Sequence, residues 1–161
     1  MRPPYHRAAA LDEVMHRAAS LSARTMIFDV EPLIAYWDTG QELLDQGIAL
    51  VLGEVAAVPG LQVVCFSTNS ARRPSAVPAA EGVHVVYLAS AGKPLRTTAY
   101  QGFPRPGVVV GDQLATDGIL ARRLGYTFLL YDPRLDGLPV GPRLMAAVGR
   151  LMRPLFFTQR G

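Results

Sequence analysis

"GVVVGDQLATDGILARRLGYTFLLYDP", residues 107–133, has the pattern of a strand, a helix and a second strand in succession. The runs 107–112 and 127–133 are short and apolar at consecutive positions, which is typical of strands buried on both faces of a parallel sheet. Between them, 115–125 has a helical pattern that Gly125 ends. This unit predicts two parallel strands joined by a right-handed crossover.

The same alternation of strand and helix patterns extends toward both ends of the chain. Three further apolar, β-branched runs predict strands at 25–30, 61–68 and 83–90. Apolar residues at helical spacing predict helices at 11–22, 41–58 and 142–155. The fold class expected is therefore α/β, a doubly wound three-layer sandwich around a five-stranded parallel sheet.

No repeat, low-complexity tract or long linker divides the chain, so we expect a single domain over residues 1–161. The core is expected to extend over about residues 11–155, with flexible ends. The least regular stretch, 69–82, is too short to hold a sizeable cap domain.

Composition excludes several classes of protein. Half of the residues are hydrophobic and 18% are charged, which does not fit a disordered chain. The single cysteine, Cys65, excludes a disulfide framework and a cysteine-rich zinc site. No run approaches the roughly 18 apolar residues of a membrane span, and the first residues do not form a signal peptide. A cytoplasmic protein is expected, and the absence of a basic cluster interleaved with aromatic residues argues against nucleic acid binding.

Polar side chains follow the predicted strands at the points where the strands end. Asp29 ends the first run, Ser67, Thr68 and Asn69 end the second, and Asp112 ends the fourth. Lys93, the only lysine in the chain, follows the third run. Each residue alone is typical of a turn or helix cap, but ligands of open α/β sheets bind beyond the carboxyl ends of the strands. Together these residues predict a site at that edge.

This set of side chains suits phosphoryl transfer. A carboxylate such as Asp29 can accept a phosphoryl group as an acyl phosphate. A divalent cation with oxygen ligands would offset the charge of carboxylate and phosphate, and a lysine and a hydroxyl would hold the phosphoryl oxygens.

Four segments resemble the motifs of the haloacid dehalogenase (HAD) superfamily of phosphatases: "FDVEP", "FSTN", "GKP" and "VVVGDQLATDGILARRLG". The similarity extends over almost the whole chain and is greatest to the capless IIIA-type branch of YqeG-like proteins, which are related to mitochondrial phosphatidylglycerophosphatase. The resemblance implies a HAD-like sheet with the five predicted strands in the order 3-2-1-4-5.

The resemblance also implies roles for individual residues. Asp29 would be the nucleophile, and Glu31 the general acid and base that protonates the leaving oxygen and later activates water. Ser67, Thr68, Asn69 and Lys93 would bind the phosphoryl group, with Ser67 and Lys93 also counted as catalytic. The implied cofactor is Mg²⁺, with ligands from Asp29, the backbone carbonyl of Glu31 and Asp112, and Asp117 would bind the metal through water or orient Lys93.

The first motif departs from the family pattern Asp-x-Asp-x-Thr. Glu31 has one methylene more than aspartate, and a displacement of about 1 Å can cost on the order of 10²-fold in rate. Pro32 removes an amide hydrogen and biases Glu31 toward an extended backbone. Leu33 lacks the threonine hydroxyl. These departures favour an alternative, a catalytically impaired pseudo-phosphatase that binds an anion or a partner protein.

The open site expected without a cap suits a large phosphorylated substrate, and the resemblance implies a lipid phosphate such as phosphatidylglycerophosphate. The segment 142–155 places leucines on one face and arginines elsewhere. Such a helix either lies on an anionic membrane surface, as a peripheral anchor, or packs on the sheet with its arginines exposed. The sequence leaves both interpretations open. It also leaves open whether the chain forms a homo-oligomer.

Overall fold

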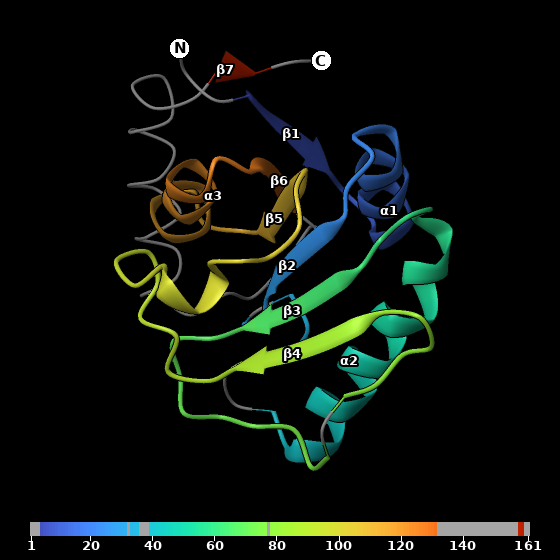
Figure 1. The fold of residues 1–161 in the computed structure, drawn as a ribbon. Helices are drawn as coiled ribbons and strands as arrows, with labels where there is room; N and C mark the ends of the chain where they lie inside the picture. Colours follow the sequence, from blue (N-terminus) through green and yellow to red (C-terminus); the bar gives the residue numbers. More distant parts are fainter. Residues whose placement is uncertain (1–3, 32, 36–38, 77, 132–157, 160–161) are drawn as a thin grey trace.

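The computed structural model describes residues 4–31, 33–35, 39–76, 78–131 and 158–159. Its centre is a parallel β-sheet with helices on both faces (Figure 1). The strands are β1 Pro4–Ala8, β2 Thr25–Asp29, β3 Val63–Ser67, β4 His84–Leu88, β5 Gly107–Gly111, β6 Thr127–Tyr131 and β7 Thr158–Gln159. The α-helices are α1 Leu11–Ser20, α2 Gln41–Glu54 and α3 Ile119–Leu124. Short 3₁₀ turns occupy Val55–Ala57 and Thr98–Tyr100, and one π-helical turn occupies Leu114–Gly118.

The prediction of a parallel sheet in an α/β fold is confirmed, but the sheet has more strands than predicted. All five predicted strands form, and their relative order is the expected one, but the full order is β4-β3-β2-β5-β6-β1-β7. The prediction of five strands was therefore wrong in count and in complete order, because β1 pairs in parallel with β6, and β7 with β1.

The segment Pro4–Ala8 precedes the core that was expected from about residue 11, but it forms a strand of the sheet. "PYHRA" carries little apolar surface, but Tyr5 is fully buried and Ala8 nearly so. Its partner β6 lies more than a hundred residues away in the sequence. The predicted helix 142–155 falls outside the described residues.

Two hydrophobic cores sandwich the sheet, because successive side chains of a strand point to opposite faces. Met26, Phe28 and Val64 face α1 and α2, where Val14, Met15, Leu44 and Ile48 pack against them. Ile27, Cys65, Val109 and Phe128 face the other way, toward Leu120 and Leu124 of α3. Figure 1 shows α1 and α2 on one side of the sheet and α3 on the other.

The helix predicted at 115–125 begins with a wider turn than an α-helix. The backbone amides of Asp117 and Gly118 both donate to the carbonyl of Gln113, and α3 follows directly. Gly125 ends α3 in the left-handed conformation (φ 68°), as its position in the sequence predicts. Among the described residues, none of the helices combines the length and apolar character that a membrane span requires.

Replacing Tyr5 with Ala should lower the free energy of unfolding by about 3–5 kcal/mol, as large aromatic truncations in a core do. The expected loss arises because Tyr5 packs with Phe128 and Leu130 in the second core. The exposed neighbour Arg7 supplies the control, since Arg7→Ala should change stability by less than about 0.5 kcal/mol. Urea denaturation measures both; equal midpoints for the two variants would contradict the burial of β1.

Candidate functional site

The carboxyl ends of three neighbouring strands bring the predicted site residues to one edge. Asp29 at the end of β2 pairs in register with Ser67 at the end of β3, and Phe28 pairs with Val110 of β5. The strand order reverses direction at β2, because β3 and β4 lie on one side of it and β5 and β6 on the other. This is the switch point at which open α/β sheets bind ligands.

Lys93 joins this edge from the loop after β4. Its ammonium Nζ lies 2.6 Å from Oδ1 of Asp29 and 3.0 Å from Oδ1 of Asp117, and it donates to the carbonyl oxygen of Ser67 at 3.2 Å. The Lys93 and Asp117 side chains are 3% and 0% exposed, so water screens these ion pairs little. Burial alone would lower the pKa of Lys93, but Asp117 and Asp29 outweigh it and hold that pKa above its ordinary value. Lys93 is therefore a cation.

Asp29 is buried beside a second carboxylate. Burial raises the pKa of Asp29 well above its ordinary value, the charge of Asp117 raises it further, and Lys93 opposes both. The site thus has more negative charge than Lys93 neutralises. An additional cation at this edge would be electrostatically favoured.

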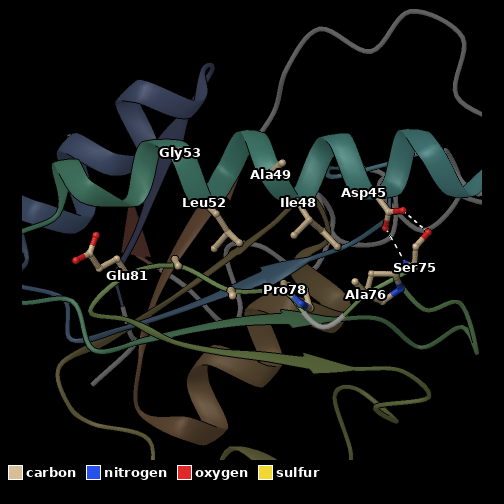
Figure 2. Close-up of a pocket in the computed structure, with 12 residues that line it drawn as sticks. Asp45, Ile48, Ala49, Leu52, Gly53, Ser75, Ala76, Pro78 and Glu81 are labelled. Carbon is tan, nitrogen blue, oxygen red and sulfur yellow. Dashed lines mark hydrogen bonds between the residues drawn. The ribbon is translucent and has the colours of Figure 1, made fainter.

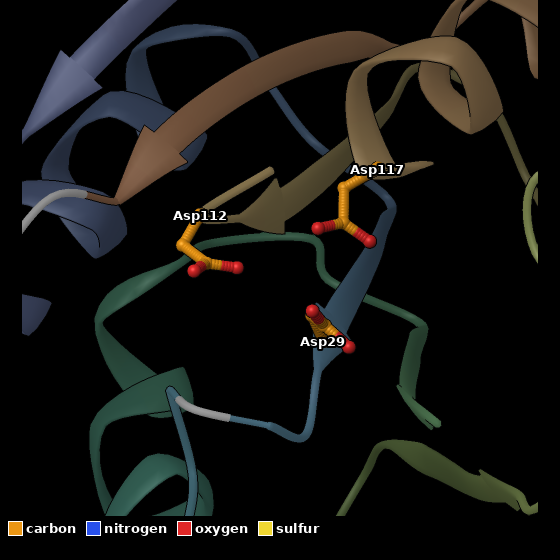
Figure 3. A group of neighbouring side chains, drawn as sticks. All are labelled: Asp29, Asp112 and Asp117. Atoms are coloured by element: carbon orange, nitrogen blue, oxygen red, sulfur yellow. The ribbon is translucent and has the colours of Figure 1, made fainter. Parts of the chain in front are cut away.

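Three carboxylates converge at the edge (Figure 3). One oxygen each of Asp29, Asp112 and Asp117 lies within 4.8 Å of the others. Gly111 permits this approach, since a Cβ at that position would collide with the Asp117 carboxylate. Three carboxylate oxygens this close together could hold a metal ion. The side chain of Glu31 is not part of the group.

Glu31 instead faces the loop after β3. The Thr68 hydroxyl donates to its Oε2, and the Ser70 hydroxyl donates to its Oε1 at 3.2 Å. The Ser70 amide in turn donates to Oγ1 of Thr68 at 2.9 Å. Each carboxylate oxygen of the buried Glu31 therefore accepts one hydroxyl hydrogen bond. The longer side chain of glutamate is accommodated by these two partners.

A polar cavity of about 160 Å³ opens between these groups. It is lined by Asp29, Glu31, Thr68, Asn69, Ser70, Lys93, Gln113 and Thr116. Five predicted site residues thus share one cavity, and Asp112 and Asp117 lie beside Asp29. Its size suits a phosphoryl group, whereas the rest of a large substrate would lie outside.

Ser67 is a predicted phosphate-binding residue that does not line the cavity. Its side chain is fully buried, and its Oγ is 2.6 Å from the Tyr100 hydroxyl. The next residue, Thr68, lines the cavity in its place. Ser67 contributes to the site through its carbonyl oxygen, which accepts from Lys93.

Ser70 and Thr116 also line the cavity, although neither was predicted from the sequence to be a site residue. Both carry a hydroxyl and lie a few positions after the end of a strand, and this pattern could have identified them. Of the departures in the first motif, Leu33 packs against the core and Pro32 lies outside the described residues. The chain closes the turn after β2 through the amides of Ile34 and Ala35, which both donate to the carbonyl of Val30.

A larger cavity, about 570 Å³, lies between α2 and the segment 74–81, away from this edge (Figure 2). Ile48, Leu52 and several prolines and alanines make its lining mostly apolar, and among the described residues no lysine, arginine or histidine lines it. Asp45 at its rim is held by Ser75, whose hydrogen bonds keep the pKa of Asp45 below its ordinary value. Five of the site residues predicted from the sequence therefore line the smaller, polar cavity, and none of them lines the larger one.

Comparison of the chain with protein-family models, curated proteins and solved structures finds no match.

Proposed function

We propose that this chain is a Mg²⁺-dependent phosphomonoester hydrolase of the HAD type, with Asp29 as its nucleophile. The observation that carries the proposal is the position of Lys93, whose buried ammonium bridges Asp29 and Asp117 at the mouth of a phosphate-sized cavity. A cation placed against a carboxylate in this way offsets the repulsion that a phosphate dianion would meet there.

In the proposed reaction a carboxylate oxygen of Asp29 attacks phosphorus in line with the leaving oxygen. The new oxygen–phosphorus bond of an acyl phosphate on Asp29 forms as the bond to the leaving oxygen breaks, and Glu31 supplies the proton that the leaving group takes. Water then attacks the acyl phosphate, gives its proton to Glu31 and releases inorganic phosphate. A bound Mg²⁺ would supply further charge neutralisation, with Asp29, Asp112 and Asp117 as its side-chain ligands.

The phosphate contacts in this proposal differ somewhat from those expected from the sequence. Thr68 takes the place of Ser67 as the hydroxyl that faces the phosphoryl group, because Ser67 Oγ is engaged with Tyr100. Lys93 contacts the phosphoryl oxygens from the opposite loop. The lipid phosphate, the peripheral membrane position and the cytoplasmic location stay predictions, since the segment 142–155 lies outside the described residues.

A pseudo-phosphatase that binds an anion is the second candidate, and the contacts of Glu31 favour it. A general acid must donate a proton, whereas both oxygens of Glu31 accept hydrogen bonds from Thr68 and Ser70. Catalysis requires these hydroxyls to turn away or to accept from a protonated Glu31. An anion-binding module has no such requirement.

Hydrolysis of an aryl phosphate with Mg²⁺, measured on wild type, Glu31→Gln and Glu31→Asp, decides between the two candidates. If Glu31 transfers the proton, Glu31→Gln should lower kcat by about 10²- to 10⁴-fold. Its amide keeps the shape of the side chain, so the unfolding midpoint should change little. No turnover in wild type together with binding of inorganic phosphate would establish the pseudo-phosphatase. A gain of activity in Glu31→Asp would then identify the extra methylene as the cause.

A further inference from the structure

The side-chain amide of Asn69 makes two hydrogen bonds to the backbone of one residue, Lys93. The Lys93 backbone amide donates to Oδ1 of Asn69 at 2.7 Å, and Nδ2 of Asn69 donates to the Lys93 carbonyl oxygen at 3.0 Å. Because a backbone N–H can only donate and a carbonyl can only accept, the orientation of the Asn69 amide is chemically determined.

These two bonds extend a backbone ladder beyond the ends of β3 and β4. The Thr68 amide donates to the Leu88 carbonyl, the Ala91 amide donates to the Thr68 carbonyl, and the Ser90 amide donates to the Ser70 carbonyl. The loop after β4 then turns through positive φ at Ser90 (50°) and Gly92 (69°). After that turn the contact with Lys93 is made by the side chain of Asn69 in place of backbone groups.

Lys93 has a long, flexible side chain, and its Nζ must meet three oxygens from three different segments. Because this side chain is buried, it has little room to compensate for a shift of the backbone, so Cα has to be fixed for that geometry to be maintained. None of the side chains of the loop 91–96 belongs to either hydrophobic core, and Leu95 and Arg96 are exposed, so little core packing fixes the loop. The Asn69 amide is the contact that does so at Lys93 itself.

We propose that Asn69 is a positioning residue: it fixes the Lys93 backbone so that the ammonium stays between Asp29 and Asp117. This role does not require Asn69 to contact phosphate. Its consequence for turnover rests on the proposed phosphatase function, whereas its consequence for Lys93 does not.

The chain offers an unusually direct probe, because Lys93 is its only lysine. Protein labelled with [¹⁵N]lysine gives one backbone amide signal and one Nζ signal by NMR. In Asn69→Ala, which loses both bonds, we expect the Lys93 amide to exchange with solvent about three- to tenfold faster. We also expect the Nζ signal to shift and broaden as the ammonium samples other positions.

Asn69→Asp refines the test, since it keeps the acceptor but places a carboxylate oxygen against the Lys93 carbonyl. It should disturb the Lys93 signals at least as much as Asn69→Ala. Ser70→Ala is the matched control: Ser70 is adjacent in the loop and bonds Glu31, so the Lys93 signals should stay as in wild type. Asn69 itself is largely exposed, so the substitutions should leave the global unfolding midpoint close to the wild-type value.

Unchanged Lys93 amide exchange and an unchanged Nζ signal in both Asn69 variants would overturn the proposal. Weaker binding of inorganic phosphate with unchanged Lys93 signals would do the same and would make Asn69 a phosphate ligand. If wild type hydrolyses aryl phosphate, Asn69→Ala should lower kcat by about tenfold with a smaller change in KM. If wild type is inactive, the phosphatase proposal fails while the NMR result still decides the role of Asn69.

Discussion

Asp29→Asn should abolish Mg²⁺-dependent hydrolysis of an aryl phosphate, with kcat reduced on the order of 10³-fold or more, as expected for loss of a covalent nucleophile. The amide has nearly the shape of the carboxylate but cannot form the acyl phosphate. The fold should tolerate it, because burial already raises the pKa of Asp29 and so disfavours the charged form. The Lys93–Asp117 ion pair remains as a partner for the ammonium.

Glu54→Gln is the matched control for that substitution, since it changes an exposed carboxylate near the end of α2 to an amide. It should leave kcat and KM at wild-type values. Chelation with EDTA should silence the wild-type enzyme, and added Mg²⁺ should restore it. Retained turnover in Asp29→Asn would exclude Asp29 as nucleophile. Absence of turnover in every variant, with no metal-dependent rise in Tm, would exclude the enzyme altogether.

The strands that the sequence predicts are those that lie at the centre of the sheet. Apolar residues at consecutive positions are typical there, because both faces are covered, and every residue of β2, β3 and β5 is buried. β1 has only two residues buried among the described side chains, and its pairing with β6 joins the two ends of the described domain. Such a pairing depends on tertiary contacts that no local pattern contains.

For the site too, some features could be predicted from the sequence and others could not. The ends of the predicted strands indicated where Asp29, Asp112 and Lys93 come together, because the carboxyl ends of parallel strands lie at one edge of the sheet. Which of two adjacent hydroxyls faces the cavity was not predictable, since a shift of one residue reverses the direction of a side chain. Ser67 and Thr68 illustrate this: one bonds Tyr100 inside the core, and the other bonds Glu31 at the cavity. The position of Glu31 likewise depends on Ser70, which comes from a different loop.

Lys93→Met should lower the free energy of unfolding by about 3–5 kcal/mol in the presence of EDTA, the usual cost of removing one partner from a buried ion pair. Methionine fills much of the space of the lysine stem but leaves Asp29 and Asp117 facing each other without the ammonium. Arg96→Met, in the same loop but exposed, should change stability by less than about 0.5 kcal/mol. Urea denaturation of the two variants gives the comparison.

Two further measurements show whether the stability lost in Lys93→Met reflects missing charge or altered packing. Mg²⁺ should raise the Tm of Lys93→Met more than that of wild type, because the metal would compensate for the missing positive charge. Adding Asp117→Asn to Lys93→Met should recover a large part of the lost stability, since it removes one of the two facing carboxylates. Both results follow if Lys93 stabilises the fold by neutralising the carboxylates at the sheet edge. If the double variant is no more stable than Lys93→Met, the loss reflects packing, and the charge balance proposed for the site is wrong.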